Sequence, residues 1–251
     1  MNQADKLSIA DKIKSGAEIE VKITKKLVIP QPEGYKRTGM QGGCTDGKYG
    51  YYAMNECGST DTVKSKIYKV DLESWQITAT ADNLLLCHAN DMAYDTKHNR
   101  IIVTHCNVRP DEVTIINPDD LRVIEVRRIP VEHYALAYNP KRNQYVAGKS
   151  RCFDFSVLDE DFNELVVYPG EDGYIKQGME CDDDFIYFFH SSVRYNHIWI
   201  YDWNGNFIRK LKVPMVGESE NLFIKGDRFI AAFNGDEEKT GVVCEMTLET
   251  K

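Results

Sequence analysis

Histidine and glutamate side chains recur along this chain beside other polar residues, where they could support acid–base chemistry. Histidine titrates near neutrality and is a common metal ligand, and the sequence contains six of them. A carboxyl group that is partly desolvated has a raised pKa, which suits a general acid or base. The candidate catalytic residues are Glu220, His88, His133, His105 and His190. Two such groups, carboxyl or imidazole, in different environments would suit a lyase, cyclase or hydrolase reaction.

Amide, phenol and basic side chains form a second group, one that could hold a small polar ligand by directed hydrogen bonds. The candidate ligand-binding residues are Gln41, Asn90, Tyr134, Gln177, Lys149, Arg194 and Asn234. The alternative is that a polar ring of this kind binds only ordered water, which buried polar groups also need.

Five imperfect repeats explain how these residues could come together. Each repeat begins with a polar or aromatic residue, enters a short apolar strand and reaches a turn. The starts are 43 to 49 residues apart, at Gln41, Asn90, Tyr134, Gln177 and Glu220. A turn residue follows each start after five positions, at Asp46, Asp95, Asn139, Asp182 and Lys225. A second set of turns has nearly the same period, at Asp71, Asn117, Asp159 and Asp202.

Four strands per repeat at this period predict an all-β fold, a five-bladed β-propeller with four-stranded blades. The last repeat lacks a strand, and a spare strand, EIEVKITKKLVIP, precedes the first repeat. We expect this N-terminal strand to close the last blade, which removes the exposed edges of an open ring. Residues 17–251 would form the propeller domain, and residues 1–16 a short helix or arm. An open β-sandwich is the alternative.

The propeller places the candidate residues on one face. Innermost strands begin near the central channel on that face, and the loops between second and third strands open onto it. Five of the six histidines fall there, and only His98 falls in a turn on the other face. Because function on repeated scaffolds concentrates at channel mouths and loops, we expect one small-molecule site at the centre of this face.

The composition restricts the partners. A formal charge of −8 argues against a nucleic-acid partner, which needs a concentrated basic surface. No window is apolar enough for a membrane span, and the first twenty residues lack the apolar core of a signal peptide. Seven cysteines without a CxxC pair are typical of reduced thiols. We therefore expect a cytoplasmic protein with no membrane partner.

No cofactor is firmly predicted. Glu218, Glu220, Asn90 and His88 could converge on a hard cation such as Ca²⁺ or Mg²⁺ at the central channel. Amides dominate the ring, however, and suit an organic ligand or a water cluster better than a strongly held cation.

The first repeat, QGGCTDGKYGYYAMNECGSTDTVKSKIYKVDLES, resembles the opening blade of the glutamine cyclotransferase family. A QG start, a short strand, a Gly/Ser-rich loop and a V-D-L strand end follow in similar order. The resemblance implies a five-bladed ring with a central acidic catalytic pocket, and the family's later acidic strand is echoed at residues 218–221. The chain is more loosely similar to NHL-type and gluconolactonase-type propellers, which implies ligand binding or metal-assisted lactone hydrolysis.

Three kinds of function fit these features. The first is binding of a small polar molecule at the channel mouth, with or without catalysis. The second is a non-catalytic scaffold that holds a protein partner, for which Tyr195 and Trp203 would be exposed aromatics. The third is carbohydrate binding, in which Trp75, Trp199 or Trp203 would be the stacking platform. We favour the first over the scaffold.

Overall fold

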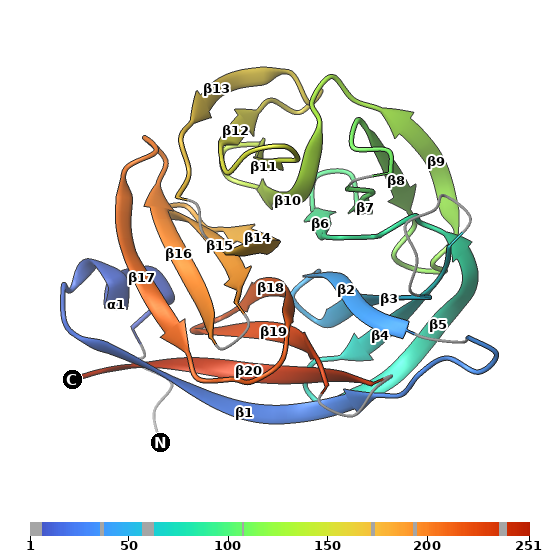
Figure 1. The fold of residues 1–251 in the computed structure, drawn as a ribbon, viewed down its shortest axis with the longest axis horizontal. Coiled ribbons are helices and arrows are strands. Elements are labelled where there is room, and N and C mark those ends of the chain that lie inside the picture. Colours follow the sequence, from blue (N-terminus) through green and yellow to red (C-terminus); the bar gives the residue numbers. More distant parts are fainter. Residues whose placement is uncertain are drawn as a thin grey trace.

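Five four-stranded antiparallel sheets are arranged as a ring in the computed structural model, which describes residues 7–35, 38–56, 63–106, 108–171, 174–192, 195–235 and 240–251 (Figure 1). The protein is therefore a five-bladed β-propeller, and the predicted fold class is confirmed. Within the described part of the chain, no helix has the length and apolar character that crossing a membrane requires.

The strands of each blade pair in sequence order from the centre of the ring outward. The first two blades are β2 (Thr38–Thr45), β3 (Tyr49–Glu56), β4 (Lys64–Asp71), β5 (Gln76–Leu85) and β6 (Met92–Asp95), β7 (Arg100–Thr104), β8 (Glu112–Ile116), β9 (Val123–Arg128). The next two are β10 (His133–Asn139), β11 (Gln144–Lys149), β12 (Phe155–Leu158), β13 (Glu164–Tyr168) and β14 (Ile175–Cys181), β15 (Phe185–Ser191), β16 (Asn196–Asp202), β17 (Phe207–Val213). The fifth is β18 (Ser219–Lys225), β19 (Arg228–Asn234), β20 (Gly241–Thr250) and β1 (Ile19–Ile29).

The predicted turns follow from side-chain chemistry that repeats between blades. Asp46 accepts hydrogen bonds from the backbone N–H groups of Lys48 and Tyr49, and from the Tyr51 hydroxyl. Asp182 makes the equivalent three contacts in the fourth blade, including one of 2.6 Å from the Tyr187 hydroxyl. Each aspartate thus closes the first hairpin of its blade and anchors an aromatic residue of the second strand.

Aromatic rings fill the space between neighbouring blades. The Tyr52 ring lies 5.7 Å from that of Phe223, across the junction between the first and last blades. Phe155 and Phe188 meet at 5.1 Å between the third and fourth blades. These contacts bury large apolar areas and add the geometric preference of aromatic pairs, so each blade is stabilised mainly by its neighbours.

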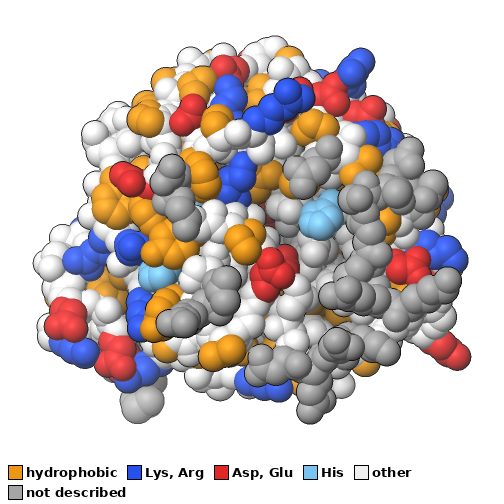
Figure 2. All heavy atoms as spheres, in the orientation of Figure 1, with side chains coloured by type: hydrophobic (Ala, Val, Ile, Leu, Met, Phe, Trp, Pro, Cys, Tyr) orange, Lys and Arg blue, Asp and Glu red, His pale blue; other side chains and the backbone are white. Residues whose placement is uncertain are grey.

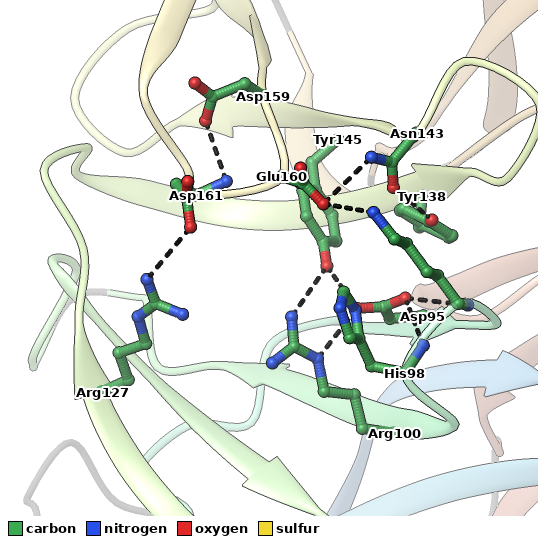
Figure 3. Close-up of polar contacts among 11 residues, drawn as sticks. Asp95, His98, Arg100, Arg127, Tyr138, Asn143, Tyr145, Asp159, Glu160 and Asp161 are labelled. Carbon is green, nitrogen blue, oxygen red and sulfur yellow. Dashed lines mark hydrogen bonds and ion pairs between the residues drawn. The ribbon is translucent and has the colours of Figure 1, made fainter.

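A buried carboxylate joins the second and third blades on the face opposite the predicted site (Figure 3). Asp95 accepts hydrogen bonds from the Tyr145 hydroxyl at 2.7 Å and the Arg100 Nε at 2.8 Å, and its Oδ2 lies 2.8 Å from His98 Nδ1. Burial by itself raises the pKa of Asp95, but the hydrogen bonds from Tyr145, His98 and Arg100 outweigh it and hold the pKa below its usual range. Asp95 is therefore an ionised structural group.

A short helix, α1 (Ile9–Lys14), precedes the ring. Ser8 caps it, and Ser8 and Asp11 form a capping box. Its buried residues Ile9, Ala10 and Ile13 join the apolar cluster of the fourth and fifth blades. Lys14 also pairs with Asp184 at 2.7 Å, so the helix is attached to the turn between β14 and β15.

The N-terminal strand closes the last blade, as the sequence predicts. β1 pairs with β20 from Ile19 opposite Thr250 to Ile29 opposite Gly241. The two strands run side by side along the outside of the ring (Figure 1). Val21 on β1 is 3% exposed and belongs to the same apolar cluster as α1.

Replacing Val21 with alanine should lower the free energy of unfolding of the whole ring by about 1–3 kcal/mol, because buried methyl groups are lost. Val28→Ala is the matched control on the same strand, since Val28 is 43% exposed. Denaturant unfolding measures both variants. Equal losses for the two valines would contradict the view that one face of β1 seals the ring.

The side chain of Asp91 connects three blades at the axis. It is fully buried, and its Oδ2 accepts hydrogen bonds from Leu136 N at 3.1 Å and Met179 N at 3.0 Å. Gly42 permits the close approach of the first blade, since a Cβ there would lie 2.6 Å from the Asp91 backbone. Burial raises the pKa of Asp91 well above its usual value, which favours the neutral form of this carboxyl group.

Asp91→Ala should destabilise the protein by about 2–5 kcal/mol, because two buried N–H groups lose their acceptor. Asp91→Asn keeps an acceptor oxygen and resembles the neutral acid, so its loss should be less than about 1.5 kcal/mol. Unfolding at pH 7 separates the two variants. A loss for Asp91→Asn as large as that for Asp91→Ala would show that the carboxyl group does not act as a neutral acceptor.

Candidate functional site

A cavity of about 430 Å³ lies at the mouth of the central channel, on the face where the innermost strands begin. We call it the central cavity. Its lining comes from all five blades: Gln41, His88, Asn90, Cys106, Tyr134, Ser150, Phe153, Tyr174, Ile175, Lys176, Gln177, Glu218 and Glu220. Figure 2 shows this face, with acidic side chains and a histidine near its centre. The structure thus brings together the five repeat-start residues and His88.

Acceptors dominate the polar lining. Glu220 is 2% exposed, and its Oε1 accepts a hydrogen bond from the Asn234 amide. Glu218 accepts one from the Gln177 Nε2 at 3.0 Å. The buried Gln41 Oε1 has no hydrogen-bond partner among the described residues, and a buried polar group of this kind requires one, such as water or a ligand.

Lys176 is a site residue that we did not anticipate from the sequence. Its ammonium group donates to the carbonyl oxygens of Lys149, Ser150 and Cys152 at 2.8–3.0 Å. It also lies 4.4 Å from the Tyr134 ring centroid, and burial lowers its pKa. Its position directly before the repeat start Gln177 was the available signal. The lysine holds the loop after β11 in place and has its donors directed at that loop.

The histidines separate into two groups. Burial lowers the pKa of His88, which lines the central cavity and is therefore a neutral imidazole at pH 7. His105, His133 and His190 are buried elsewhere in the blades and do not line this cavity.

Contacts of these three histidines are structural. The His105 Nε2 lies 2.7 Å from the Thr114 hydroxyl, and the His133 Nδ1 donates to the Val131 carbonyl oxygen. His190 packs beside Trp199, with ring centroids 5.7 Å apart. Burial lowers the pKa of each of the three to about 4.

Lys149 and Asn234 do not line the central cavity. Lys149 pairs with Glu164 at 2.6 Å and lines a separate surface hollow. Asn234 supports Glu220, and its Oδ1 also accepts from Met40 N at 2.7 Å. Arg194 falls outside the described residues. The roles of all these residues stay predictions.

The described residues contain no group of three or more histidine, cysteine, aspartate or glutamate side chains arranged to hold a metal ion. In the central cavity, Glu218 and Glu220 are each hydrogen-bonded to an amide. The Ca²⁺ or Mg²⁺ considered from the sequence for the central channel stays a prediction.

Comparison with solved structures supports the fold. A tail fibre of Staphylococcus aureus phage P68 aligns with a TM-score of 0.66 and 13% identity over 90% of this chain. This chain spans 52% of the tail-fibre chain. The glutaminyl cyclase of Myxococcus xanthus aligns with a TM-score of 0.63 and 12% identity, over 91% of this chain and 97% of the cyclase.

A chain of a nidogen/laminin complex aligns with a TM-score of 0.54 and 10% identity, over 86% of each chain. No family model matches the sequence, and no curated protein matches it. At these identities the likeness defines the class, a five-bladed propeller, and not the activity.

The three buried histidines provide a pH test. Because their folded pKa values lie below the unfolded value of about 6.5, their contribution to stability is complete above pH 6.5. It is lost as the pH falls towards about 4. An NMR titration should show these three rings neutral down to about pH 4, and His133→Asn should reduce the fall in unfolding free energy over this interval. Midpoints near 6.5 would contradict the assignment.

Proposed function

We propose that this propeller binds a small polar molecule rich in hydrogen-bond donors, such as one bearing an amino group, in the central cavity. The observation that carries the proposal is the convergence of polar side chains from five blades on one cavity of about 430 Å³. Concave sites with a few converging polar groups are the usual form of small-molecule sites.

The charges support a donor-rich ligand. Glu218 and Glu220 line the cavity, and the Gln41 Oε1 is an acceptor without a partner in the described part of the chain. The one lysine in the lining, Lys176, directs its ammonium group at three backbone carbonyls. An anionic ligand would therefore meet two carboxyl groups without a directed cation to balance them.

A first experiment measures thermal unfolding with a panel of amino sugars, amino acid amides and glutaminyl dipeptides, against hydroxyl-only sugars. A ligand at one hundred times its Kd should stabilise the protein by about 2.7 kcal/mol. Glu218→Gln and Gln177→Ala should abolish the shift. Glu160→Gln, on the opposite face, is a matched carboxyl-to-amide control and should retain it. A panel without any shift, or a shift that survives in Glu218→Gln, would count against the proposal.

Catalysis is a finer proposal for the same cavity. Neutral His88 and the buried Glu220 could move a proton between an amine and a leaving group. The structural likeness to a glutaminyl cyclase suggests one reaction to test. In it, the α-amine nitrogen of an N-terminal glutamine forms a bond to the side-chain amide carbon, and ammonia leaves with a proton taken from the amine.

Mass spectrometry of glutaminyl peptides would detect this ring closure by the loss of ammonia. Any activity found should fall at least tenfold in Glu220→Gln, while binding measured by thermal shift remains. Retention of full activity in that variant would remove Glu220 from the mechanism.

A protein-binding role is the second candidate, and exposed apolar residues favour it. Ile175, Tyr195 and Val216 are 52%, 48% and 71% exposed beside the mouth of the channel.

Trp203 donates to the Asp182 carbonyl oxygen, and Trp199 is buried, so neither offers an open sugar-stacking platform on this face. The cytoplasmic location and the exclusion of nucleic acid stay predictions.

A further inference from the structure

A second cavity, of about 520 Å³, lies at the opposite end of the channel, between α1 and the far ends of the innermost strands. We call it the helix-side cavity. All five blades contribute to it, and its walls are largely apolar: Ile9, Ala10, Met92, Leu136, Met179 and Ile224. It is large enough for a molecule of about ten non-hydrogen atoms, and it shares no lining residue with the central cavity.

Glu180 is the carboxyl group in this apolar cavity. Its Oε1 accepts a hydrogen bond from Cys181 N at 2.9 Å, and its Oε2 accepts one from Ile224 N at 3.3 Å. Burial raises the pKa of Glu180 to about 8, against the two hydrogen bonds that lower it. At pH 7 the group is therefore a neutral acid that would ionise if a positive charge were placed beside it.

The titratable groups facing Glu180 are acidic or neutral. Asp182 lies in the turn after β14 and raises the pKa of Glu180 further. Burial raises the pKa of Asp91, near the axis, and those of the thiols Cys44 and Cys181. None of these groups supplies a cation to Glu180.

The rim is acidic as well. Asp46, Asp182, Asp183 and Asp184 line the cavity, and no lysine, arginine or histidine is among its described lining residues. Lys141 pairs with Asp183, and Lys14 with Asp184. Asp46 and Asp182 are held by backbone N–H groups and tyrosine hydroxyls, and Lys48 and Lys14 respectively interact with them electrostatically from the rim.

We propose that the helix-side cavity binds an organic monocation, an alkyl- or arylalkylammonium ion whose apolar body packs against the methionine and leucine side chains while its nitrogen pairs with Glu180. The apolar walls suit a ligand with an apolar body, and the acidic rim disfavours an anion. Pairing requires Glu180 to give its proton to solvent, so binding releases close to one proton per ligand at pH 7. Below pH 8 the dissociation constant should rise about tenfold for each unit by which the pH falls.

Isothermal titration calorimetry with 2-phenylethylammonium chloride tests this site. We expect binding at pH 7 with a heat that differs between phosphate and HEPES buffers, because a released proton is taken up by the buffer. The neutral isostere 2-phenylethanol should bind at least tenfold more weakly, and 3-phenylpropanoate should not bind. Glu180→Gln, which keeps the size of the side chain, should weaken binding of the ammonium ion at least tenfold. It should also remove the dependence of the binding heat on the buffer.

The location is checked by two further measurements. The methyl signals of Met92 and Met179 in a methionine-labelled NMR sample should shift with the ammonium ion, because both residues line the helix-side cavity. Glu218→Gln, in the central cavity, is the matched control and should leave the affinity unchanged. Absence of binding, equal binding of the alcohol, or loss of binding in Glu218→Gln but not in Glu180→Gln would overturn the proposal. The last result would place the cation in the central cavity instead.

Discussion

A buried carboxyl group at the axis constrains the whole ring. Asp91 belongs to the second blade, yet its oxygen accepts backbone N–H groups from the third and the fourth. Asn221 of the fifth blade makes the complementary link, since its amide donates to the Gln41 carbonyl oxygen at 2.6 Å and accepts from Ala232 N. Inner strands that meet at a point cannot all pair with one another, and these two side chains take the place of the missing ladder bonds.

This arrangement at the axis also accounts for two separate cavities. A channel filled by Asp91 and Asn221 leaves space only at its two ends, and each end inherits a different lining. Strands begin at the mouth of the central cavity with polar residues such as Gln41 and Gln177, and they pass apolar residues such as Met92 and Met179 before the far end. The two ends therefore differ in polarity although the same five strands line both.

The sequence predicted the architecture well because the repeats carry their own local chemistry. The turn residues Asp46 and Asp182 are recognisable at fixed positions, and the incomplete last repeat together with the spare strand before the first implied the closure by β1. The ring of Gln41, Asn90, Tyr134, Gln177 and Glu220 followed from the same period.

Side-chain direction was not accessible from that period. A loop histidine near one face can point into the channel, as His88 does, or into a blade, as His105 and His133 do. The difference depends on partners far along the chain. Lys176 and Glu180 were missed for the same reason: their environments are built from segments of other blades.

The pairing of β1 with β20 joins residues that are almost the whole chain apart, such as Glu20 and Glu249. During synthesis β1 leaves the ribosome long before its partner exists, and it has an unpaired edge until β20 emerges. Contacts of such high sequence separation slow folding, and an open strand edge is a template for pairing with another chain. The ring thus closes only after β20 is made, and until then a nascent chain must be kept from others.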